Sequence, residues 1–226
     1  MDDVTKAKKV AGEEACTFVK DGMTVGLGTG STAEWAVKRL GELRLDIKCV
    51  PTSKGIHELA ESVGLEVISF EDFNKQGLKI DLDIDGADRI DPEFNLIKGG
   101  GGCQTREKAV AKASRQFFVV ADDSKLVKRL LGSFPIAVEV LPQKLNAVEK
   151  ALSSYGKAKL RDFTTDNGNK ILDLEVESNL HETDLNELEE SLNLIDGVID
   201  NGLFTFQRPQ KVFISHLGGA VDVLEI

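Results

Sequence analysis

The chain has 226 residues, of which 41% are hydrophobic and 29% are charged, a composition typical of a globular protein with a buried core. Its formal net charge of −10 argues against a broad nucleic-acid surface, and no apolar stretch approaches the roughly 18 residues of a membrane span, so we expect neither nucleic-acid nor membrane partners. Three scattered cysteines without a CxxC pair suggest neither a disulfide framework nor a zinc site, and with no signal peptide apparent we expect a reducing, cytoplasmic setting.

Strands and helices alternate along the first half of the chain. The apolar spacing predicts helices over residues 4–20, 33–43, 54–63 and 105–115, and strands over 23–27, 47–50, 65–69, 80–84 and 116–121. Alternation with short connections predicts an open parallel sheet with helices on both faces. We therefore expect a Rossmann-like α/β fold.

The second half of the chain has a different pattern. Strands are predicted over 135–142, 158–163, 171–176 and 198–206, helices over 146–156 and 184–195, and an Asn-Gly turn between the second and third strands. This β-α-β-β-α-β order is the ferredoxin-like pattern. Because residues 212–219 resemble another strand of the first sheet, we expect a Rossmann-like catalytic domain over 1–131 and 207–226. A smaller ferredoxin-like α+β domain is then inserted over 132–206.

The first cluster that carries chemistry is the loop GLGTGST, residues 26–32, between a predicted strand and a predicted helix. Glycines let the backbone approach a ligand closely, and a helix N-terminus supplies amide donors and a partial positive charge. Ser31 and Thr32 add hydroxyl donors. We expect anion or polyol binding here, and the alternative is a tight turn with a Ser or Thr N-cap.

The second cluster is DLDIDGAD, residues 81–88. Strand alternation places Asp81, Asp83 and Asp85 on one face. Asp85 lies at the carboxyl end of the strand, where open α/β sheets bind ligands, and Asp88 follows a Gly-Ala turn. We expect a catalytic or sugar-hydroxyl role for Asp85 and Asp88. The alternatives are a magnesium site for the pair and a helix cap for Asp88.

The third cluster is Lys98 followed by four glycines, Gly99–Gly102, which we call the glycine loop. Four consecutive glycines are costly in chain entropy, so we expect this loop to wrap a ligand while Lys98 stabilises a developing oxyanion. A flexible connection is the alternative. Glu107 follows in the first turn of the next predicted helix, where the helix dipole favours any acid. Beside the other clusters it becomes a candidate general base.

The combination of GTGST, DGAD, KGGGG and TREK, with ADDSK and TDNGN later in the chain, resembles the type A ribose-5-phosphate isomerase family. The match runs nearly from end to end and includes the inserted domain. The resemblance implies an aldose–ketose isomerase, an intramolecular oxidoreductase of carbohydrate metabolism. Its substrates would be the sugar phosphates D-ribose 5-phosphate and D-ribulose 5-phosphate of the non-oxidative pentose phosphate pathway. It further implies no metal, no cofactor, and a homodimer or homotetramer.

The same resemblance implies the site residues. The family's proton acceptor falls on Glu107, a substrate-binding lysine on Lys125, and the phosphate-binding lysine near the N-terminus on Lys8. The substrate loops fall on Thr29, Gly30, Ser31, Thr32, Asp85, Gly86, Ala87, Asp88, Lys98, Gly99, Gly100 and Gly101. The chain departs from the family at Arg89, where relatives often have Glu, and we expect Arg89 to alter the local field at Asp88.

The predicted mechanism is acid–base catalysis through an enediolate. Asp88 assists opening of the furanose ring, Glu107 carries the proton from C2 to C1, and Asp85 relays a proton between O1 and O2. Lys98 and amides of the glycine loop stabilise the developing negative charge. No cofactor is needed, because the substrate carbonyl accepts the electron pair itself.

Two other classes of function remain open from the sequence. A sugar-phosphate sensor domain would use a similar fold, although the acidic charge and the lack of a basic N-terminal domain argue against a transcriptional regulator. A different enzyme on this fold, such as an amino-sugar phosphate deaminase or a CoA transferase, is the second alternative. A CoA transferase needs a nucleophilic carboxylate, a role that Glu107 matches by residue type alone.

Overall fold

The computed structural model describes residues 2–180 and 183–225, and the chain forms two compact units, each with its own sheets and core. Unit 1 comprises Met1–Ala87, Arg106–Lys125 and Pro209–Ile226, and unit 2 comprises Asp88–Thr105 and Leu126–Arg208. The predicted domain boundaries, with an inserted domain over 132–206, stay a prediction. The compact units differ from it because residues 88–105 group with the second half of the chain.

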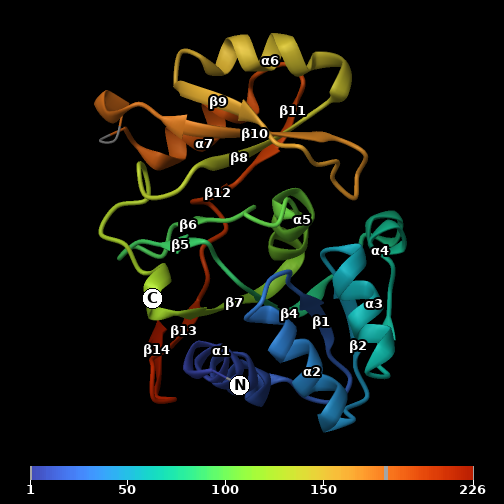
Figure 1. The fold of residues 1–226 in the computed structure, drawn as a ribbon. Helices are drawn as coiled ribbons and strands as arrows, with labels where there is room; N and C mark the ends of the chain where they lie inside the picture. The colour runs from blue at the N-terminus through green and yellow to red at the C-terminus, as the bar shows by residue number, and fades with distance from the viewer. Residues whose placement is uncertain (1, 181–182, 226) are drawn as a thin grey trace. The chain divides into compact units, whose positions relative to one another are not determined.

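Unit 1 contains a seven-stranded sheet with the order β14-β13-β7-β4-β1-β2-β3 (Figure 1). Its strands in chain order are β1 (Thr24–Leu27), β2 (Lys48–Pro51), β3 (Glu66–Val67), β4 (Ile80–Asp85), β7 (Ser114–Asp122), β13 (Lys211–Ser215) and β14 (Val221–Glu225). Neighbouring strands are parallel except β13 and β14, which form an antiparallel hairpin at one edge. The predicted α/β fold is confirmed. The strand predicted over 212–219 is β13, which ends earlier, at Ser215, and the antiparallel strand β14 that follows it was not predicted.

The helices of unit 1 cover two apolar cores. They are α1 (Asp3–Ala15), η1 (Cys16–Phe18), α2 (Ala33–Leu43), α3 (Lys54–Ser62), α4 (Phe70–Gln76), α5 (Gln104–Ala113, its first two residues in unit 2) and η2 (Asp123–Lys125). Apolar side chains of α1, α2 and α3 pack with Val25 and Leu27 of β1, while Val110 of α5 packs against Gly26. Successive strand residues face opposite sides, so helices lie on both faces of the sheet.

Helix α4 was not predicted, because it is only seven residues long and follows a strand that is shorter than expected. Its signals are local: Ser69 caps it by accepting a hydrogen bond from the Asp72 amide, and Gly77 ends it in the left-handed conformation with φ +56°. The predicted helix over 4–20 also ends early, since α1 gives way to the 3₁₀ turn η1.

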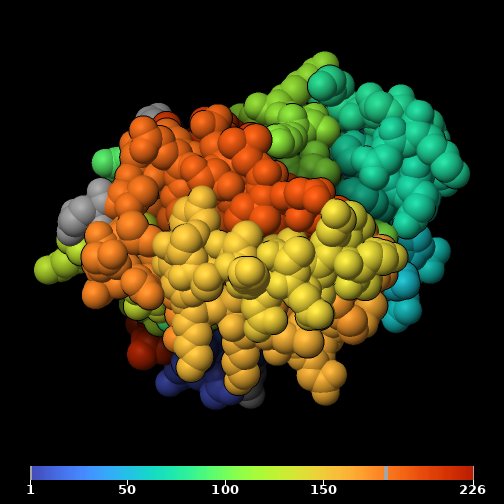
Figure 2. Space-filling view, turned by 90° about the horizontal axis from the view of Figure 1, so that it is seen from above, coloured from blue at the N-terminus to red at the C-terminus, as the bar shows by residue number. Residues whose placement is uncertain are grey.

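Unit 2 contains a four-stranded antiparallel sheet with the order β11-β8-β10-β9. Its elements in chain order are β8 (Ile136–Val140), η3 (Pro142–Lys144), α6 (Leu145–Leu152), β9 (Gly156–Leu160), β10 (Lys170–Val176), η4 (Ser178–Leu180), α7 (Leu185–Asn193) and β11 (Val198–Asn201). The fourth, first, third and second strands of the motif lie in that spatial order, which confirms the predicted ferredoxin-like pattern. Figure 2 shows α6, in yellow, exposed along the surface of this unit.

A second, three-stranded sheet of unit 2 has the order β12-β6-β5. It consists of β5 (Arg89–Ile90), β6 (Leu96–Ile97) and β12 (Leu203–Phe204). The predicted strand over 198–206 is therefore interrupted at Gly202, where an added Cβ would lie 2.3 Å from the Lys98 carbonyl oxygen. Only glycine permits so close a backbone approach, and this sheet sets the position at which the glycine loop leaves β6.

Candidate functional site

The loop after β1 is joined to the loop after β2 through hydroxyl groups. Thr29 Oγ1 lies 2.8 Å from Thr52 Oγ1 and donates to Ser53 Oγ at 2.9 Å. Ser53 is also the N-cap of α3 and accepts a hydrogen bond from the Ile56 amide at 3.2 Å. Since β1 and β2 are parallel neighbours, these contacts fix the GTGST loop at the carboxyl edge of the sheet.

The start of α2 is contacted by a lysine from α1. Lys8 Nζ donates to Ser31 Oγ at 2.9 Å, so two predicted phosphate ligands that are 23 positions apart in sequence come together. Gly30 has φ +138°. Thr32 is the N-cap residue of α2, and its side chain makes no capping hydrogen bond to this helix, all of whose residues the structure describes. An ammonium group, a hydroxyl and a helix N-terminus together suit a phosphate dianion.

Asp85 ends β4 and is fully buried. Its Oδ1 accepts a hydrogen bond from the Gly86 amide at 2.6 Å. Gly28 lies directly against this carboxylate, since an added Cβ would come within 2.0 Å of Asp85 Oδ1. By contrast, Asp81 at the other end of β4 is engaged with the Thr24 amide at 2.9 Å and the Arg115 guanidinium at 3.1 Å. Asp81 therefore has a structural role.

Glu107 lies on α5 and is 4% exposed. Val110 lies one helical turn after Glu107, on the same face of α5. Val110 and Asp83 are neighbours beside Gly26, because a Cβ added to Gly26 would lie 2.6 Å from a side-chain atom of each. Helix α5 is the crossover before β7, which runs parallel to β4, so its first turn lies toward the carboxyl end of β4. Glu107 therefore lies nearer than Val110 to the carboxyl end of β4, where Asp85 is located.

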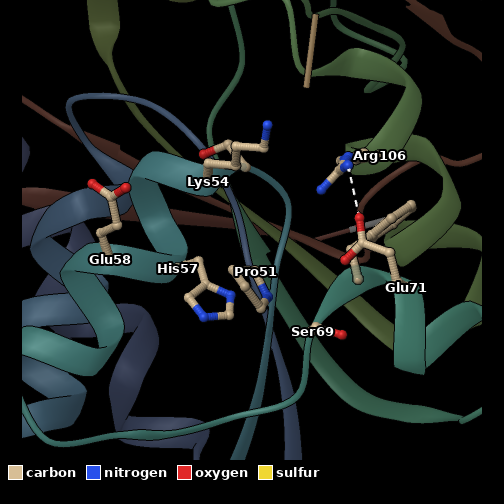
Figure 3. A pocket seen from close by; sticks show the side chains of 9 residues that line it. Pro51, Lys54, His57, Glu58, Ser69, Glu71 and Arg106 are labelled. Carbon is tan, nitrogen blue, oxygen red and sulfur yellow. Dashed lines mark hydrogen bonds and ion pairs between the residues drawn. The ribbon is translucent and has the colours of Figure 1, made fainter. Parts of the chain in front are cut away.

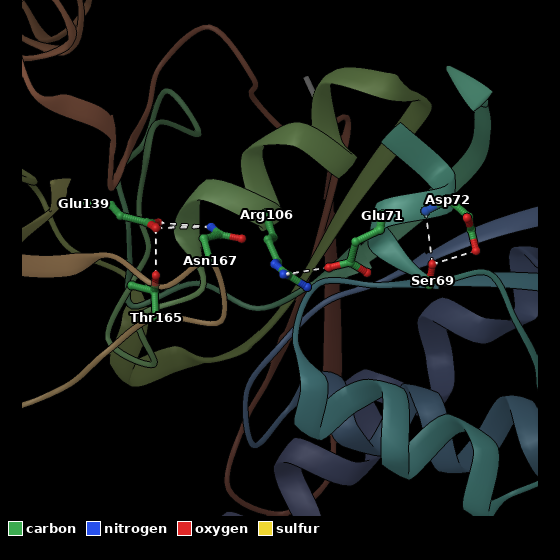
Figure 4. Close-up of polar contacts among 7 residues, drawn as sticks. All are labelled: Ser69, Glu71, Asp72, Arg106, Glu139, Thr165 and Asn167. Carbon is green, nitrogen blue, oxygen red and sulfur yellow. Dashed lines mark hydrogen bonds and ion pairs between the residues drawn. The ribbon is translucent and has the colours of Figure 1, made fainter. Parts of the chain in front are cut away.

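Arg106 is a residue for which the sequence suggested no role. Its guanidinium forms an ion pair with Glu71 at 3.2 Å (Figures 3 and 4). It also lies 4.6 Å from the centre of the Phe70 ring. Only 8% of its side chain is exposed. These contacts tie the start of α5, and with it Glu107, to α4. A cavity of about 250 Å³ beside them is lined by Pro51, Ser53, Lys54, His57, Glu58, Ser69, Phe70, Glu71 and Arg106 (Figure 3).

Lys125 lies in η2, directly after the carboxyl end of β7. The turn is held on both sides. Asp122 accepts hydrogen bonds from the amide and hydroxyl of Ser124, and Asp123 accepts one from His216 Nδ1 at 3.0 Å. His216 Nε2 is 2.9 Å from Asp222, and its two carboxylate partners, first Asp222 and then Asp123, raise the pKa of this imidazole above 6.5.

In unit 2, Asp88 contacts the glycine loop. Its Oδ2 accepts a hydrogen bond from the Gly100 amide at 2.7 Å, and its own amide donates to the Ile97 carbonyl at 2.8 Å. Asp88 precedes β5 and caps no helix, so the capping alternative is wrong. Arg89 donates to the Asp88 main-chain carbonyl at 2.6 Å and stacks 5.0 Å from the Phe134 ring centre.

Lys98 is 2% exposed, and its Nζ lies 5.6 Å from the centre of the Phe204 ring. The glycine loop that follows begins with Gly99 at φ +102° and closes a turn in which the Gly102 amide donates to the Gly99 carbonyl at 2.9 Å. The loop therefore has a defined backbone conformation, and this hydrogen bond argues against the alternative of a flexible connection.

Within 2–180 and 183–225, no group of three or more His, Cys, Asp and Glu side chains could hold a metal ion. In the same part of the chain, no helix is long and apolar enough to cross a membrane.

Sequence comparison finds related proteins over almost the whole chain. A family model described as ribose 5-phosphate isomerase A (phosphoriboisomerase A) matches residues 48–219. The chain is similar to ribose-5-phosphate isomerase A of Bacillus mycoides, with 41% identity over 91% of this chain and 94% of the relative.

Solved structures of the same kind superimpose closely. Ribose 5-phosphate isomerase A from Methanocaldococcus jannaschii has a TM-score of 0.88 and 38% identity, covering 97% of this chain and 98% of its own. A D-ribose-5-phosphate isomerase in complex with phospho-erythronic acid has a TM-score of 0.90 and 37% identity, covering 100% of both chains.

Proposed function

The chain belongs to the ribose 5-phosphate isomerase A family and is an aldose–ketose isomerase, and we propose that Glu107 is the base with which it interconverts D-ribose 5-phosphate and D-ribulose 5-phosphate. The observation that carries this assignment is the burial of the Glu107 carboxylate on the first turn of α5, on the helix face that packs beside Asp83. A buried carboxylate at the carboxyl edge of a parallel sheet is well placed to move protons on a bound substrate.

The reaction moves one proton between two carbons and one between two oxygens. Glu107 removes the proton from C2 of the open-chain aldose, and the electron pair passes to O1 to give an enediolate. Asp85 transfers a proton between O1 and O2, and protonated Glu107 returns its proton to C1. The close contact of Gly28 with Asp85 supports this role, because it holds the carboxylate in one position.

Phosphate binding is assigned to Ser31 and Thr32 at the start of α2 and to Lys8 of α1, which contacts Ser31. Lys125 is assigned as a further cation. The 2.9 Å contact between Lys8 and Ser31 supports the first part of this assignment. Phospho-erythronic acid, a phosphorylated sugar acid, is bound by one solved relative, which supports a sugar-phosphate site. Backbone groups of Thr29, Gly30, Gly86 and Ala87 are assigned to the sugar hydroxyls.

The residues of unit 2 keep their assignments from the sequence. Asp88 assists ring opening, while Lys98 and the amides of Gly99 and Gly101 stabilise the negative charge of the enediolate, and Gly100 is part of the same substrate loop. The hydrogen bond from the Gly100 amide to Asp88 supports a functional link between the carboxylate and the glycine loop. No cofactor enters this scheme, because the substrate carbonyl accepts the electron pair.

We further propose that the protein forms a homodimer or homotetramer and acts in the cytoplasm in the non-oxidative pentose phosphate pathway. Exposed apolar side chains of unit 2, among them Leu194, Ile199 and Phe206, support self-association. Three cysteines that form no disulfide are compatible with a reducing compartment. Light scattering of the purified protein measures the assembly directly.

The decisive experiment incubates the protein with ribose 5-phosphate in deuterated water and follows ribulose 5-phosphate and carbon-bound deuterium. We expect ketose formation with solvent exchange at the transferred position, which neither a sugar-phosphate sensor nor a CoA transferase would produce. The Glu107→Gln variant should bind substrate but lose roughly 10²–10⁴-fold in turnover. Its control is Glu42→Gln, which removes only a surface ion pair with Arg39. Near-normal turnover of Glu107→Gln would disprove the base assignment while leaving the isomerase activity standing.

A further inference from the structure

An arginine of the inserted β-sheet, for which the sequence suggested no role, is bonded to the glycine loop. Arg161 directly follows β9, and its Nη1 donates to the carbonyl oxygens of Gly99 at 3.0 Å and Gly100 at 3.2 Å. It is 62 positions away from Gly99 in sequence, and all of these residues belong to unit 2. One guanidinium thus holds two consecutive peptide groups of the loop.

The guanidinium is itself fixed by Asp173 on β10. Arg161 Nε donates to Asp173 Oδ2 at 2.9 Å, and Nη2 donates to Oδ1, which makes the pair bidentate. About a fifth of each side chain is exposed, 22% for Arg161 and 23% for Asp173. Bidentate, charge-assisted pairs of this kind restrict the orientation of the guanidinium plane. Arg161 therefore meets the loop in a single defined orientation.

The planarity of the peptide group converts these contacts into an orientation for the loop amides. In a trans peptide, the carbonyl of one residue and the N–H of the next point in opposite directions. Because the Gly99 carbonyl faces Arg161, the Gly100 N–H faces the other way, where it donates to Asp88 at 2.7 Å. By the same geometry, the Gly101 N–H points away from the guanidinium. The Gly100 carbonyl and the Gly101 N–H belong to the same peptide group, so the charged donor on this carbonyl also makes the Gly101 N–H a stronger hydrogen-bond donor.

The segment that carries Arg161 is held by a buried carboxylate. Glu139 on β8 is fully buried and accepts hydrogen bonds from Thr165 Oγ1 at 2.8 Å and Asn167 Nδ2 at 3.1 Å (Figure 4). It also accepts one from Asn169 Nδ2 at 2.8 Å. These three residues belong to the TDNGN motif, which the mechanism leaves unexplained. A buried carboxylate with three donors stabilises one conformation of the turn.

The same segment packs against the end of the glycine loop. Phe163 lies so close to Gly102 that an added Cβ would come within 2.6 Å of its ring, and Gly102 has φ +76°. The loop is therefore contacted by Asp88 at Gly100, by Arg161 at Gly99 and Gly100, and by Phe163 at Gly102.

We propose that Arg161, fixed by Asp173 and by the TDNGN turn, is a positioning residue that aims the Gly101 N–H at the oxyanion of the enediolate. This inference rests on the proposed function of the glycine loop and adds to it the group that orients its amides. Arg161 acts through the loop backbone and does not itself touch the reacting atoms. A preorganised donor is most effective where charge develops, so the effect belongs to the chemical step more than to substrate binding.

The test compares steady-state kinetics of Arg161→Ala, Arg161→Lys and Asp173→Asn with ribose 5-phosphate. A misplacement of about 1 Å can cost on the order of 10²-fold, so we expect kcat of Arg161→Ala to fall roughly 10- to 100-fold while KM changes less than about 3-fold. Arg161→Lys, which keeps the charge but not the paired donors, should be intermediate, and Asp173→Asn should show a smaller loss. Millimolar guanidinium should partly restore kcat of Arg161→Ala.

The matched control is Lys159→Ala, which removes an exposed cation from the same strand end and should leave kcat unchanged. Amide hydrogen exchange at Gly100 and Gly101 supplies a second readout that does not depend on activity, and Arg161→Ala should accelerate it. Unchanged kcat and unchanged exchange in a folded Arg161→Ala variant would overturn the inference. If the wild-type protein lacked isomerase activity, the proposed function would fail, whereas the exchange measurement would still decide whether Arg161 orders the loop.

Discussion

The side chain of Asp85 fills the space in front of Gly28, so that a Cβ on Gly28 would lie 2.0 Å from its Oδ1. Gly28 directly follows β1, and Asp85 is the last residue of the neighbouring parallel strand β4. The Gly28 amide donates to the Ile84 carbonyl at 2.9 Å. The first glycine of GTGST is thus required by the carboxylate beside it, in addition to any contact with a ligand.

Replacing this glycine should disturb both stability and activity. In Gly28→Ala, the new methyl group overlaps Asp85, and overpacking of this kind typically costs about 1–3 kcal/mol. We expect a lower midpoint in urea unfolding and a strongly reduced kcat. Gly55→Ala is the control, because an added Cβ there has nothing within 4 Å and should stabilise α3 by up to about 1 kcal/mol. Full activity of Gly28→Ala would show that Asp85 need not keep its position.

Asp85→Asn tests the proton relay. Asparagine keeps the shape of the side chain and an oxygen that can accept the Gly86 amide, but it cannot exchange a proton between O1 and O2. We expect turnover to fall by roughly 10²-fold or more while the protein stays folded. Asp81→Asn on the same strand should weaken only the contacts with Thr24 and Arg115. A wild-type rate for Asp85→Asn would remove this residue from the mechanism.

Lys8→Ala tests the phosphate assignment. A hydrogen bond to a charged group is worth about 1.5–3 kcal/mol, so KM for ribose 5-phosphate should rise roughly 10- to 100-fold. Because phosphate lies away from the reacting carbons, kcat should fall less than KM rises. Lys6→Ala breaks only a surface pair with Asp3 at 3.1 Å and should behave as wild type. Equal kinetics for the two variants would place the phosphate elsewhere.

His216 should make part of the stability of unit 1 depend on pH. Its pKa in the folded protein is raised by Asp222 and Asp123, so the protonated form is favoured by folding. The stabilisation is therefore complete below the unfolded pKa of about 6.5 and is lost as pH rises through the higher folded pKa. Urea unfolding should show a larger difference between wild type and His216→Gln in acid than in alkaline buffer. A difference that grows with pH would contradict the assignment.

The three cysteines should differ sharply toward thiol reagents. Burial raises the pKa of both Cys16 and Cys49 to about 12, so neither forms thiolate at neutral pH. Cys103 is partly exposed beside the glycine loop. A colorimetric disulfide reagent should therefore modify one thiol in the native protein and three after denaturation. Modification of more than one thiol in the native state would indicate that the core of unit 1 opens.

Much of the architecture could be predicted because it depends on local periodicity. The alternation of short apolar strands with helical segments was sufficient for the parallel sheet, and the β-α-β-β-α-β order was sufficient for the ferredoxin-like unit. Helix α4 and the two-residue strands β5 and β6 escaped prediction, and β12 was predicted only as part of a longer strand. Segments so short contain too few residues for a period to show, and the strands exist only through pairing with distant partners.

The sequence by itself was sufficient to propose the residues of the site: the GTGST loop, Asp85 and Asp88, Lys98 with its glycines, and Glu107. It could do so because glycine runs and clustered carboxylates are costly unless a ligand or close packing requires them. Only the tertiary structure decided which groups hold them in position, such as Lys8 on Ser31 and Arg161 on Gly99 and Gly100. These pairs join segments 23 to 62 positions apart in sequence. Such contacts form only when sheets and helices pack together, so they cannot be predicted from a local sequence pattern.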